Sequence, residues 1–167
     1  MVEPDEPSQR AEIIDSLLSY TRGIDRLDKE SVISAFHPGA TLNNYGPEPM
    51  SIEDFVEYAL PSLQKRYSAT QHRVSNIRVE IDGDRALVES YVLAYHVESE
   101  EDSKRLHTFN GRYIDTFTYS DRQWKISERS LRNDWSKVED ITAEMAGSSV
   151  WVASSRSTDD PIYDFGN

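Results

Sequence analysis

The sequence has 167 residues, 37% of them hydrophobic, and its 30 acidic against 18 basic residues give a formal net charge of −12. This length suits a single domain, and the negative charge makes nucleic acid and membrane surfaces poor partners. Because the chain has no cysteine, disulfides, a thiolate nucleophile and cysteine-ligated metals are excluded.

Two helices are predicted at the start of the chain. Apolar residues recur at helical spacing over residues 11–27, and Ser8 precedes them as a candidate N-cap. A short helix is predicted after Asp28, which is typical of an N-cap. We expect this helix to stop at residues 37–39, His-Pro-Gly.

A third helix is predicted from Ser51. Asp54 follows three residues later, a spacing that resembles a capping box. Pro61 lies within the same apolar pattern. We expect it to kink the helix or to end its first part.

Beyond residue 71 the apolar residues adopt the period of strands. Residues 77–81 alternate between apolar and charged side chains, and Asp82-Gly83-Asp84 is typical of a hairpin turn. Further strands are expected over residues 86–97, 106–119 and 124–133, with the acidic stretch 98–104 as a loop. The order is helices first, followed by an antiparallel meander.

The predicted strand at residues 86–97 is apolar on both faces. One face carries Val88, Val92 and Ala94, and the other carries Leu87, Tyr91, Leu93 and Tyr95. A strand in a sheet with one solvated face would alternate between apolar and polar residues instead. Since three helices cover only one face, we expect a homo-oligomer, a dimer or trimer, unless the C-terminal tail covers the second face.

The composition divides the chain into a domain at residues 1–139 and a tail at residues 140–167. The tail is serine-rich and also carries Val150, Trp151, Val152, Ile162, Tyr163 and Phe165. We therefore expect it to dock on the domain or on a neighbouring subunit. No apolar run approaches a membrane span and residues 1–8 lack signal-peptide features, so we expect a cytoplasmic protein.

The sequence contains no glycine-rich phosphate loop, no serine nucleophile elbow and no histidine pair at metal-ligand spacing. We expect a small-molecule substrate, with neither cofactor nor metal. Isolated polar groups in apolar surroundings are the remaining candidates for chemistry.

Asp25 and His72 each allow two interpretations. Asp25 is either a helix-terminal residue that binds the following turn or the partner of a base, and His72 is either a boundary residue or that base. If Asp25 accepted a hydrogen bond from one ring nitrogen, the other nitrogen could take a proton. Tyr20 can face the same cavity only if the helix ends or opens near Gly23.

A further polar set lies on the predicted strands: His96, His107, Asn110, Arg112, Tyr113, Asp115 and Arg129. Most members of such a set are strand-surface residues. Arg112 and Arg129 have apolar neighbours, where a buried guanidinium needs a carboxylate or a substrate anion.

Six segments together resemble the SnoaL-like branch of the nuclear transport factor 2-like (NTF2-like) superfamily. They are SYTRGIDRLD at 19–28, FHPGA at 36–40, TQHRV at 70–74, IDGDRA at 81–86, GRYID at 111–115 and QWKI at 123–126. The resemblance covers about residues 8–135. It implies an α+β cone, in which a curved antiparallel sheet wraps around helices and encloses a deep pocket.

The members of this family include polyketide cyclases, scytalone dehydratase, bile-acid dehydratase, ketosteroid isomerases and hexachlorocyclohexane dehydrochlorinase. They move a proton beside a carbonyl or leaving group without a cofactor. The resemblance implies an Asp-His dyad at Asp25 and His72. It also matches Tyr20 to the bile-acid dehydratase tyrosine and Arg129 to the dehydrochlorinase arginine. Substrate contacts are expected from Tyr45, from His96, which resembles the second histidine of scytalone dehydratase, and from Tyr113, where that enzyme has asparagine.

The leading hypothesis is a cofactor-independent lyase or isomerase of the dehydratase type. Its substrate would be a cyclic apolar molecule such as a polyketide, steroid or aromatic intermediate. Elimination of water is favoured, with ring closure or double-bond migration as further reactions. The alternative is a non-catalytic ligand-binding or assembly subunit resembling the small β-subunits of ring-hydroxylating dioxygenases, and a protein-transport adaptor is a third reading without a motif of its own.

Overall fold

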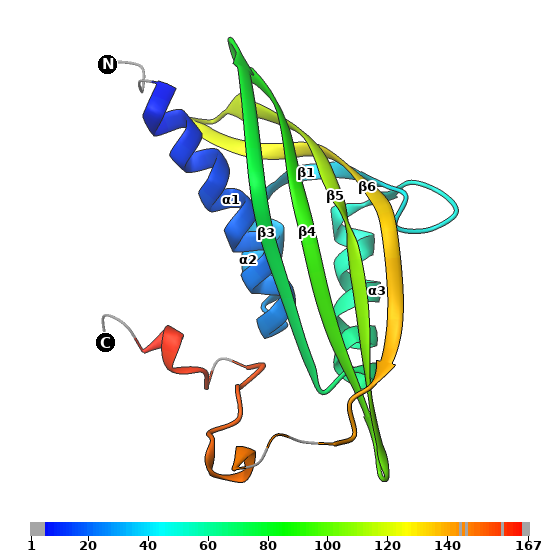
Figure 1. The fold of residues 1–167 in the computed structure, drawn as a ribbon. Coiled ribbons are helices and arrows are strands. Elements are labelled where there is room, and N and C mark those ends of the chain that lie inside the picture. The colour runs from blue at the N-terminus through cyan, green and yellow to red at the C-terminus, as the bar shows by residue number, and fades with distance from the viewer. Residues whose placement is uncertain (1–5, 144, 146, 158, 165–167) are drawn as a thin grey trace.

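One curved, open sheet packs against the helices of this chain (Figure 1). The computed structural model describes residues 6–143, 145, 147–157 and 159–164. Within them the strand order is β2-β1-β6-β5-β4-β3, with β1 parallel to β6 and all other neighbours antiparallel. The strands are β1 (Phe36–Asn43), β2 (Met50–Ser51), β3 (Ala69–Asp82), β4 (Arg85–Glu100), β5 (Ser103–Ser120) and β6 (Gln123–Asp140). The fold is the expected α+β cone.

The first helix, α1 (Glu6–Arg26), buries an apolar stripe of Ile13, Leu17, Tyr20 and Ile24 against the sheet. It begins earlier than predicted, and Ser8 lies in its first turn instead of at the N-cap. Pro7 suits that turn because its missing N–H has no intrahelical partner there. None of the described helices is long and apolar enough to cross a membrane.

The second helix, α2 (Lys29–Ser34), begins as predicted. The Asp28 carboxylate accepts a hydrogen bond from the backbone N–H of Ser31 at 3.1 Å. Gly23 lets α2 approach α1 closely, because a Cβ there would lie 2.7 Å from Val32. The two helices therefore pack as one unit beside the sheet.

The predicted helix stop at residues 37–39 is wrong, because these residues belong to strand β1. Pro38 and Gly39 lie where the pairing of β1 with β6 is interrupted, between Phe36 and Thr41, and Gly39 has φ +72°. Proline and glycine are common both at irregularities in a strand and at the ends of helices. The sequence pattern could not distinguish them.

The third helix, α3 (Ile52–Arg66), begins at its predicted N-cap, since the Ser51 hydroxyl accepts from the Asp54 N–H at 3.0 Å. Pro61 lies inside this helix and does not end it. Leu60 and Leu63 pack on the core on either side of the proline. This packing outweighs the lost backbone hydrogen bond.

The strands β3 to β6 form the predicted meander, and the hairpin turn at residues 83–84 is confirmed. The expected loop at residues 98–104 is wrong, because β4 continues to Glu100 and β5 begins at Ser103. Glu98 is a strand residue whose carboxylate pairs with Arg66 and Arg105. Because Arg66 and Arg105 balance the charge of Glu98, the acidic stretch that predicted a loop can form the ends of two strands.

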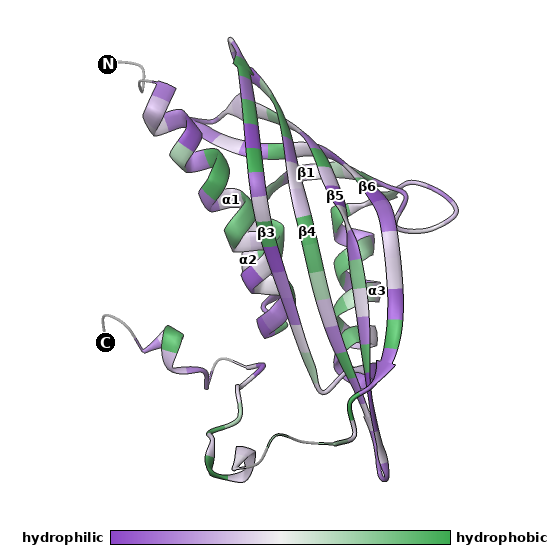
Figure 2. Ribbon diagram, in the orientation of Figure 1, coloured by the Kyte–Doolittle hydropathy of each residue, from purple (hydrophilic) through white to green (hydrophobic). Residues whose placement is uncertain are grey.

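The two faces of the sheet differ in burial. The concave face packs Val88, Val92 and Ala94 against the helices. Figure 2 shows hydrophobic stretches along α1 and β4. On the convex face Leu87, Tyr91 and Trp135 are 44–52% exposed in the single chain.

The C-terminal segment contacts the ends of the helices through polar groups. Arg26 pairs with Asp160, and the Tyr163 hydroxyl donates to Asp28 at 3.1 Å. Two short 3-10 turns, η1 (Ser148–Val150) and η2 (Pro161–Tyr163), lie along this segment. Its apolar residues Val150, Trp151 and Val152 are exposed, and Phe165 lies outside the described residues.

Candidate active site

A cavity of about 290 Å³ lies between the concave face of the sheet and helices α1 and α3. Its apolar wall is made by Ile24, Phe55, Ala59, Leu63, Ala94, Phe109 and Leu131. Its polar groups are Tyr20, Tyr45, Tyr58, Ser62, His72, His96 and Tyr113. A few polar groups converging in an apolar chamber are typical of a small-molecule site.

His72 and Asp25 form a hydrogen-bonded pair at the edge of this cavity. Asp25 lies in the last turn of α1 and His72 on β3, and the Nδ1–Oδ1 distance is 2.7 Å. Their side chains are 9% (His72) and 13% (Asp25) exposed. Because an ionised carboxylate can only accept, Nδ1 carries the hydrogen and Nε2 of the neutral ring is free to accept a proton.

Two further donors hold the Asp25 carboxylate. The backbone N–H of His72 donates to Oδ2 at 2.8 Å, and the Thr70 hydroxyl donates to Oδ1 at 3.0 Å. Burial by itself raises the pKa of Asp25, but the hydrogen bonds from His72 and Thr70 lower it below its usual value. Asp25 therefore stays ionised and aligns the imidazole.

His96 lies beside His72 inside the cavity. The two rings meet edge to face with centroids 5.1 Å apart. Burial, and then the neighbouring His72, lower the pKa of His96 to about 4. His96 is therefore neutral at physiological pH.

A group of tyrosines forms the wall opposite the histidines. The hydroxyl oxygens of Tyr20 and Tyr45 are 3.4 Å apart, and the Tyr113 ring meets Tyr20 edge to face at 5.9 Å. Burial raises the pKa of both Tyr45 and Tyr113 well above the usual value. These phenols remain protonated and can donate to a substrate oxygen.

Arg129 lies behind this tyrosine wall and is not among the residues that line the cavity. Its Nε and Nη2 each donate to Asp115 at 2.7 Å, and both side chains are fully buried. Its guanidinium carbon lies 4.3 Å from the centre of the Tyr20 ring and 4.0 Å from that of Tyr113. Burial lowers the pKa of Arg129, but the Asp115 carboxylate raises it above its usual value, so the guanidinium stays charged.

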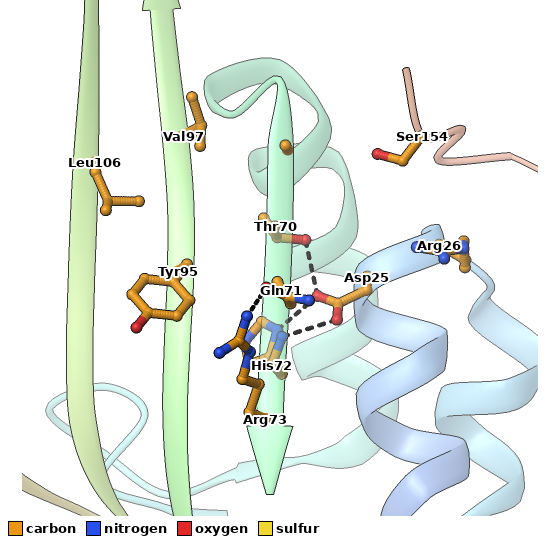
Figure 3. A pocket seen from close by; sticks show the side chains of 11 residues that line it. Asp25, Arg26, Thr70, Gln71, His72, Arg73, Tyr95, Val97, Leu106 and Ser154 are labelled. Atoms are coloured by element: carbon orange, nitrogen blue, oxygen red, sulfur yellow. Dashed lines mark hydrogen bonds and ion pairs between the residues drawn. The ribbon is translucent and has the colours of Figure 1, made fainter. Parts of the chain in front are cut away.

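A second, larger hollow of about 730 Å³ runs along the edge strand β3 outside the cavity (Figure 3). Asp25, Thr70 and His72 border it on one side, and Tyr95, Val97 and Leu106 on the other. The polar groups that could handle a substrate converge in the smaller cavity. We therefore place the candidate active site there, with Asp25 on the outer side of its wall.

The structure brings six of the seven predicted site residues together: Tyr20, Tyr45, His72, His96 and Tyr113 on the cavity surface and Asp25 behind His72. The interpretation of Arg112 as a buried cation is wrong, since it pairs with Glu89 at the surface. The sequence reading missed Thr70, although it lies two residues before His72 on the same face of β3. Among the described residues no group of three His, Asp or Glu side chains could hold a metal ion.

The comparison with known families decides the identity of the fold. Residues 5–130 match the SnoaL-like domain. The chain belongs to the SnoaL-like family. This confirms the resemblance seen in the sequence and agrees with the α+β cone.

Several solved structures share this SnoaL-like fold. Kfla4162 from Kribbella flavida is 24% identical, with 80% of this chain and 95% of that chain covered and a TM-score of 0.70. A hexachlorocyclohexane dehydrochlorinase, LinA type 2, is 20% identical, with 84% of this chain and 96% of that chain covered and a TM-score of 0.71. A Novosphingobium aromaticivorans protein, named as a candidate scytalone dehydratase, is 22% identical, with 88% of this chain and 97% of that chain covered and a TM-score of 0.67. A search of curated proteins gave no match.

Proposed function

We propose that this SnoaL-like protein is a cofactor-independent lyase or isomerase for a compact, mostly apolar, cyclic molecule that carries an oxygen function. The observation that carries this proposal is the Asp25–His72 pair, 2.7 Å apart, with His72 on an apolar cavity. An oriented neutral imidazole in a water-poor site is a general base. The similarity in fold to a dehydrochlorinase agrees with such chemistry.

In the proposed reaction His72 Nε2 takes a proton from carbon. For an elimination, the C–H electrons form the new double bond while the C–O bond breaks, and the proton on His72 passes to the departing oxygen to give water. Tyr20 and Tyr45 donate hydrogen bonds to the oxygen that gains charge. Arg129, one layer behind, supports these phenols electrostatically through the face of Tyr20.

The proposal is tested with a library of cyclic ketones, hydroxyketones and polyketide-like phenols. Products of water loss or isomerisation are detected by mass spectrometry. For any substrate found, His72→Ala is expected to lower kcat/KM by roughly 10²–10⁴-fold, the usual size of a general-base contribution. Turnover that survives His72→Ala within a few-fold would show that the mechanism is wrong.

The alternative, a non-catalytic binding or assembly subunit, predicts a different outcome. Such a subunit needs no oriented base, whereas three donors here hold Asp25 against His72. In this case library compounds would bind the cavity and return unchanged. Binding that is equal in wild type and His72→Ala, without product, would favour the alternative.

We also propose that a second copy of the chain covers the convex face of the sheet. Leu87, Tyr91 and Trp135 are about half exposed there in the single chain. Burying them against a second copy would remove three large apolar side chains from water. Light scattering is expected to give a dimer or trimer that Tyr91→Arg weakens, and a wild-type monomer at all concentrations would refute this.

A further inference from the structure

The C-terminal segment inserts a cation beside the proposed active site. The guanidinium of Arg156 donates to three backbone carbonyls: Tyr67 at 2.6 Å, Leu63 at 3.4 Å and Asp25 at 3.4 Å. Leu63 lines the cavity and Asp25 belongs to the dyad. One side chain therefore contacts both helices that carry cavity residues.

The position of Arg156 suits the ends of these helices. The last carbonyls of a helix have no intrahelical donor, and a cation there is stabilised by the helix dipole. Asp25 and Leu63 lie in the last turns of α1 and α3. The Leu63 carbonyl also accepts from the Tyr67 N–H at 3.1 Å, and helix α2 packs on both α1 and α3. Arg156 adds a polar link between the C-terminal ends of these two helices.

The same segment makes further contacts with the helices at residues that follow Arg156. Asp160 pairs with Arg26 at 3.1 Å, and the Tyr163 hydroxyl donates to the α2 N-cap, Asp28. Arg22 lies 5.1 Å above the Tyr163 ring. Ser154 borders the outer hollow beside Asp25 (Figure 3). The segment thus forms a strap across the helix ends, which we define as residues 154–157 and 159–163.

We propose that Arg156 is a positioning residue that clamps α1 to α3, holds Asp25 against His72 and thereby limits the access of solvent to His72 and His96. This rests on the proposed function for its catalytic meaning, but the clamp itself is independent of turnover. It assigns the tail a role in building the site. Without the clamp, water would enter beside His72 and His96.

Carbethoxylation of histidine by diethyl pyrocarbonate tests the clamp without any substrate. The full-length wild type is compared with Arg156→Gln and Arg156→Lys, and each histidine is followed by peptide mass spectrometry. Arg156→Gln is expected to react about tenfold faster at His72 and His96, because it loses charge-assisted hydrogen bonds. Arg156→Lys, which keeps the cation, is expected to stay closer to wild type.

Two controls distinguish a local effect of Arg156 from a general loosening of the fold. His37 Nε2 donates to the Thr118 carbonyl outside the cavity, and the carbethoxylation rate of His37 is expected to stay unchanged in every variant. Arg85→Gln removes an exposed arginine at the β3–β4 hairpin and is expected to behave as wild type. In a substrate assay, Arg156→Gln is expected to lower kcat more than it changes KM, with partial rescue by Arg156→Lys.

Equal rates at His72 and His96 in wild type and Arg156→Gln would overturn the proposal, as would equal acceleration at His37. If Arg156→Gln fails to fold, Asp160→Asn with Tyr163→Phe loosens the strap while leaving Arg156 in place. That variant is expected to accelerate the same two histidines to a smaller degree, and no acceleration would overturn the clamp. Acceleration in a protein without turnover would refute the proposed function and leave the clamp intact.

Discussion

The described residues contain two carboxylate–histidine pairs, which differ in their surroundings. Asp25–His72 has an N–O distance of 2.7 Å, and Glu98–His107 has one of 3.0 Å. Glu98 also pairs with Arg66 and Arg105, so two cations share its charge. Asp25 has only His72 and neutral donors on its carboxylate oxygens among the interactions described.

A short distance between a carboxylate and a histidine does not by itself make the histidine a general base. His107 does not line the cavity, whereas His72 does. The Glu98 carboxylate holds the end of the β4–β5 hairpin together with its arginine partners. Exclusive pairing and access to an apolar chamber distinguish the candidate catalytic pair from the structural one.

The largest expected effect is on catalysis, from Asp25→Asn. The amide can donate to Nδ1 and favour the wrong tautomer of His72, so kcat/KM for an identified substrate is expected to fall roughly 10²–10⁴-fold. The matched change Glu98→Gln is expected to cost less than about threefold, since His107 takes no part in proton transfer. Equal losses in the two variants would erase the distinction between the pairs.

The next effect is on stability, from Arg129→Gln. This change leaves the buried Asp115 carboxylate without its partner and is expected to cost about 3–5 kcal/mol of unfolding free energy. Arg112→Gln, which breaks the surface pair with Glu89, is the control and is expected to cost far less. Urea denaturation measures both. A loss for Arg129→Gln no larger than that for Arg112→Gln would show that the buried pair is dispensable.

His96 gives a smaller, pH-dependent effect. Its pKa is about 4 in the folded chain against an ordinary 6.5, so the unfolded chain takes up the proton first. Stability is therefore expected to fall as pH drops from about 6.5 to 4, by up to about 3 kcal/mol from this group. The neighbours that act on it are His72, Asp25, His107 and Arg156.

The check is to compare wild type with His96→Gln in urea at several pH values. The variant is expected to lose less stability between pH 6.5 and 4, because glutamine takes up no proton. The same slope in both proteins would show that His96 is not held neutral. His107→Gln serves as the control that keeps the cavity histidine.

The smallest expected effect comes from the Asp25 carboxylate itself at low pH. Its folded pKa lies below the ordinary 3.8, so its contribution to stability is present above that value and is lost as pH falls through the folded pKa. Asp25→Asn is therefore expected to differ in slope from wild type only in the acid region, below about pH 4. Unfolding curves from pH 2 to 5 give this slope, and a difference near neutrality would contradict it.

The sequence predicts much of the fold because its strongest signals are local. The helical stripe before Asp25 and the turn at residues 82–84 depend on neighbouring residues only. Strand β1 escaped prediction because Pro38 and Gly39, which serve a break in strand pairing, look like a helix terminus. That pairing is with β6, far along the chain, which no local pattern can show.

The candidate site was predicted through the family resemblance more than through spacing. Asp25 and His72 are far apart in sequence and meet only because β3 packs on α1. Arg129 was identified, but its place behind Tyr20 depends on the pairing of β5 with β6. The role of Arg156 was not predicted, because its guanidinium binds backbone carbonyls. Every residue type carries such a carbonyl, so the sequence gives no sign of the contact.

Proton exchange at carbon tests the central claim most directly. The bicyclic ketone 2-tetralone has acidic hydrogens beside its carbonyl, and their replacement by deuterium in D2O is followed by mass spectrometry. Wild type is expected to exchange them faster than His72→Ala by roughly 10²-fold or more, with Glu98→Gln close to wild type. Exchange by wild type at the rate of His72→Ala would contradict the claim that His72, aligned by Asp25, removes hydrogen from carbon.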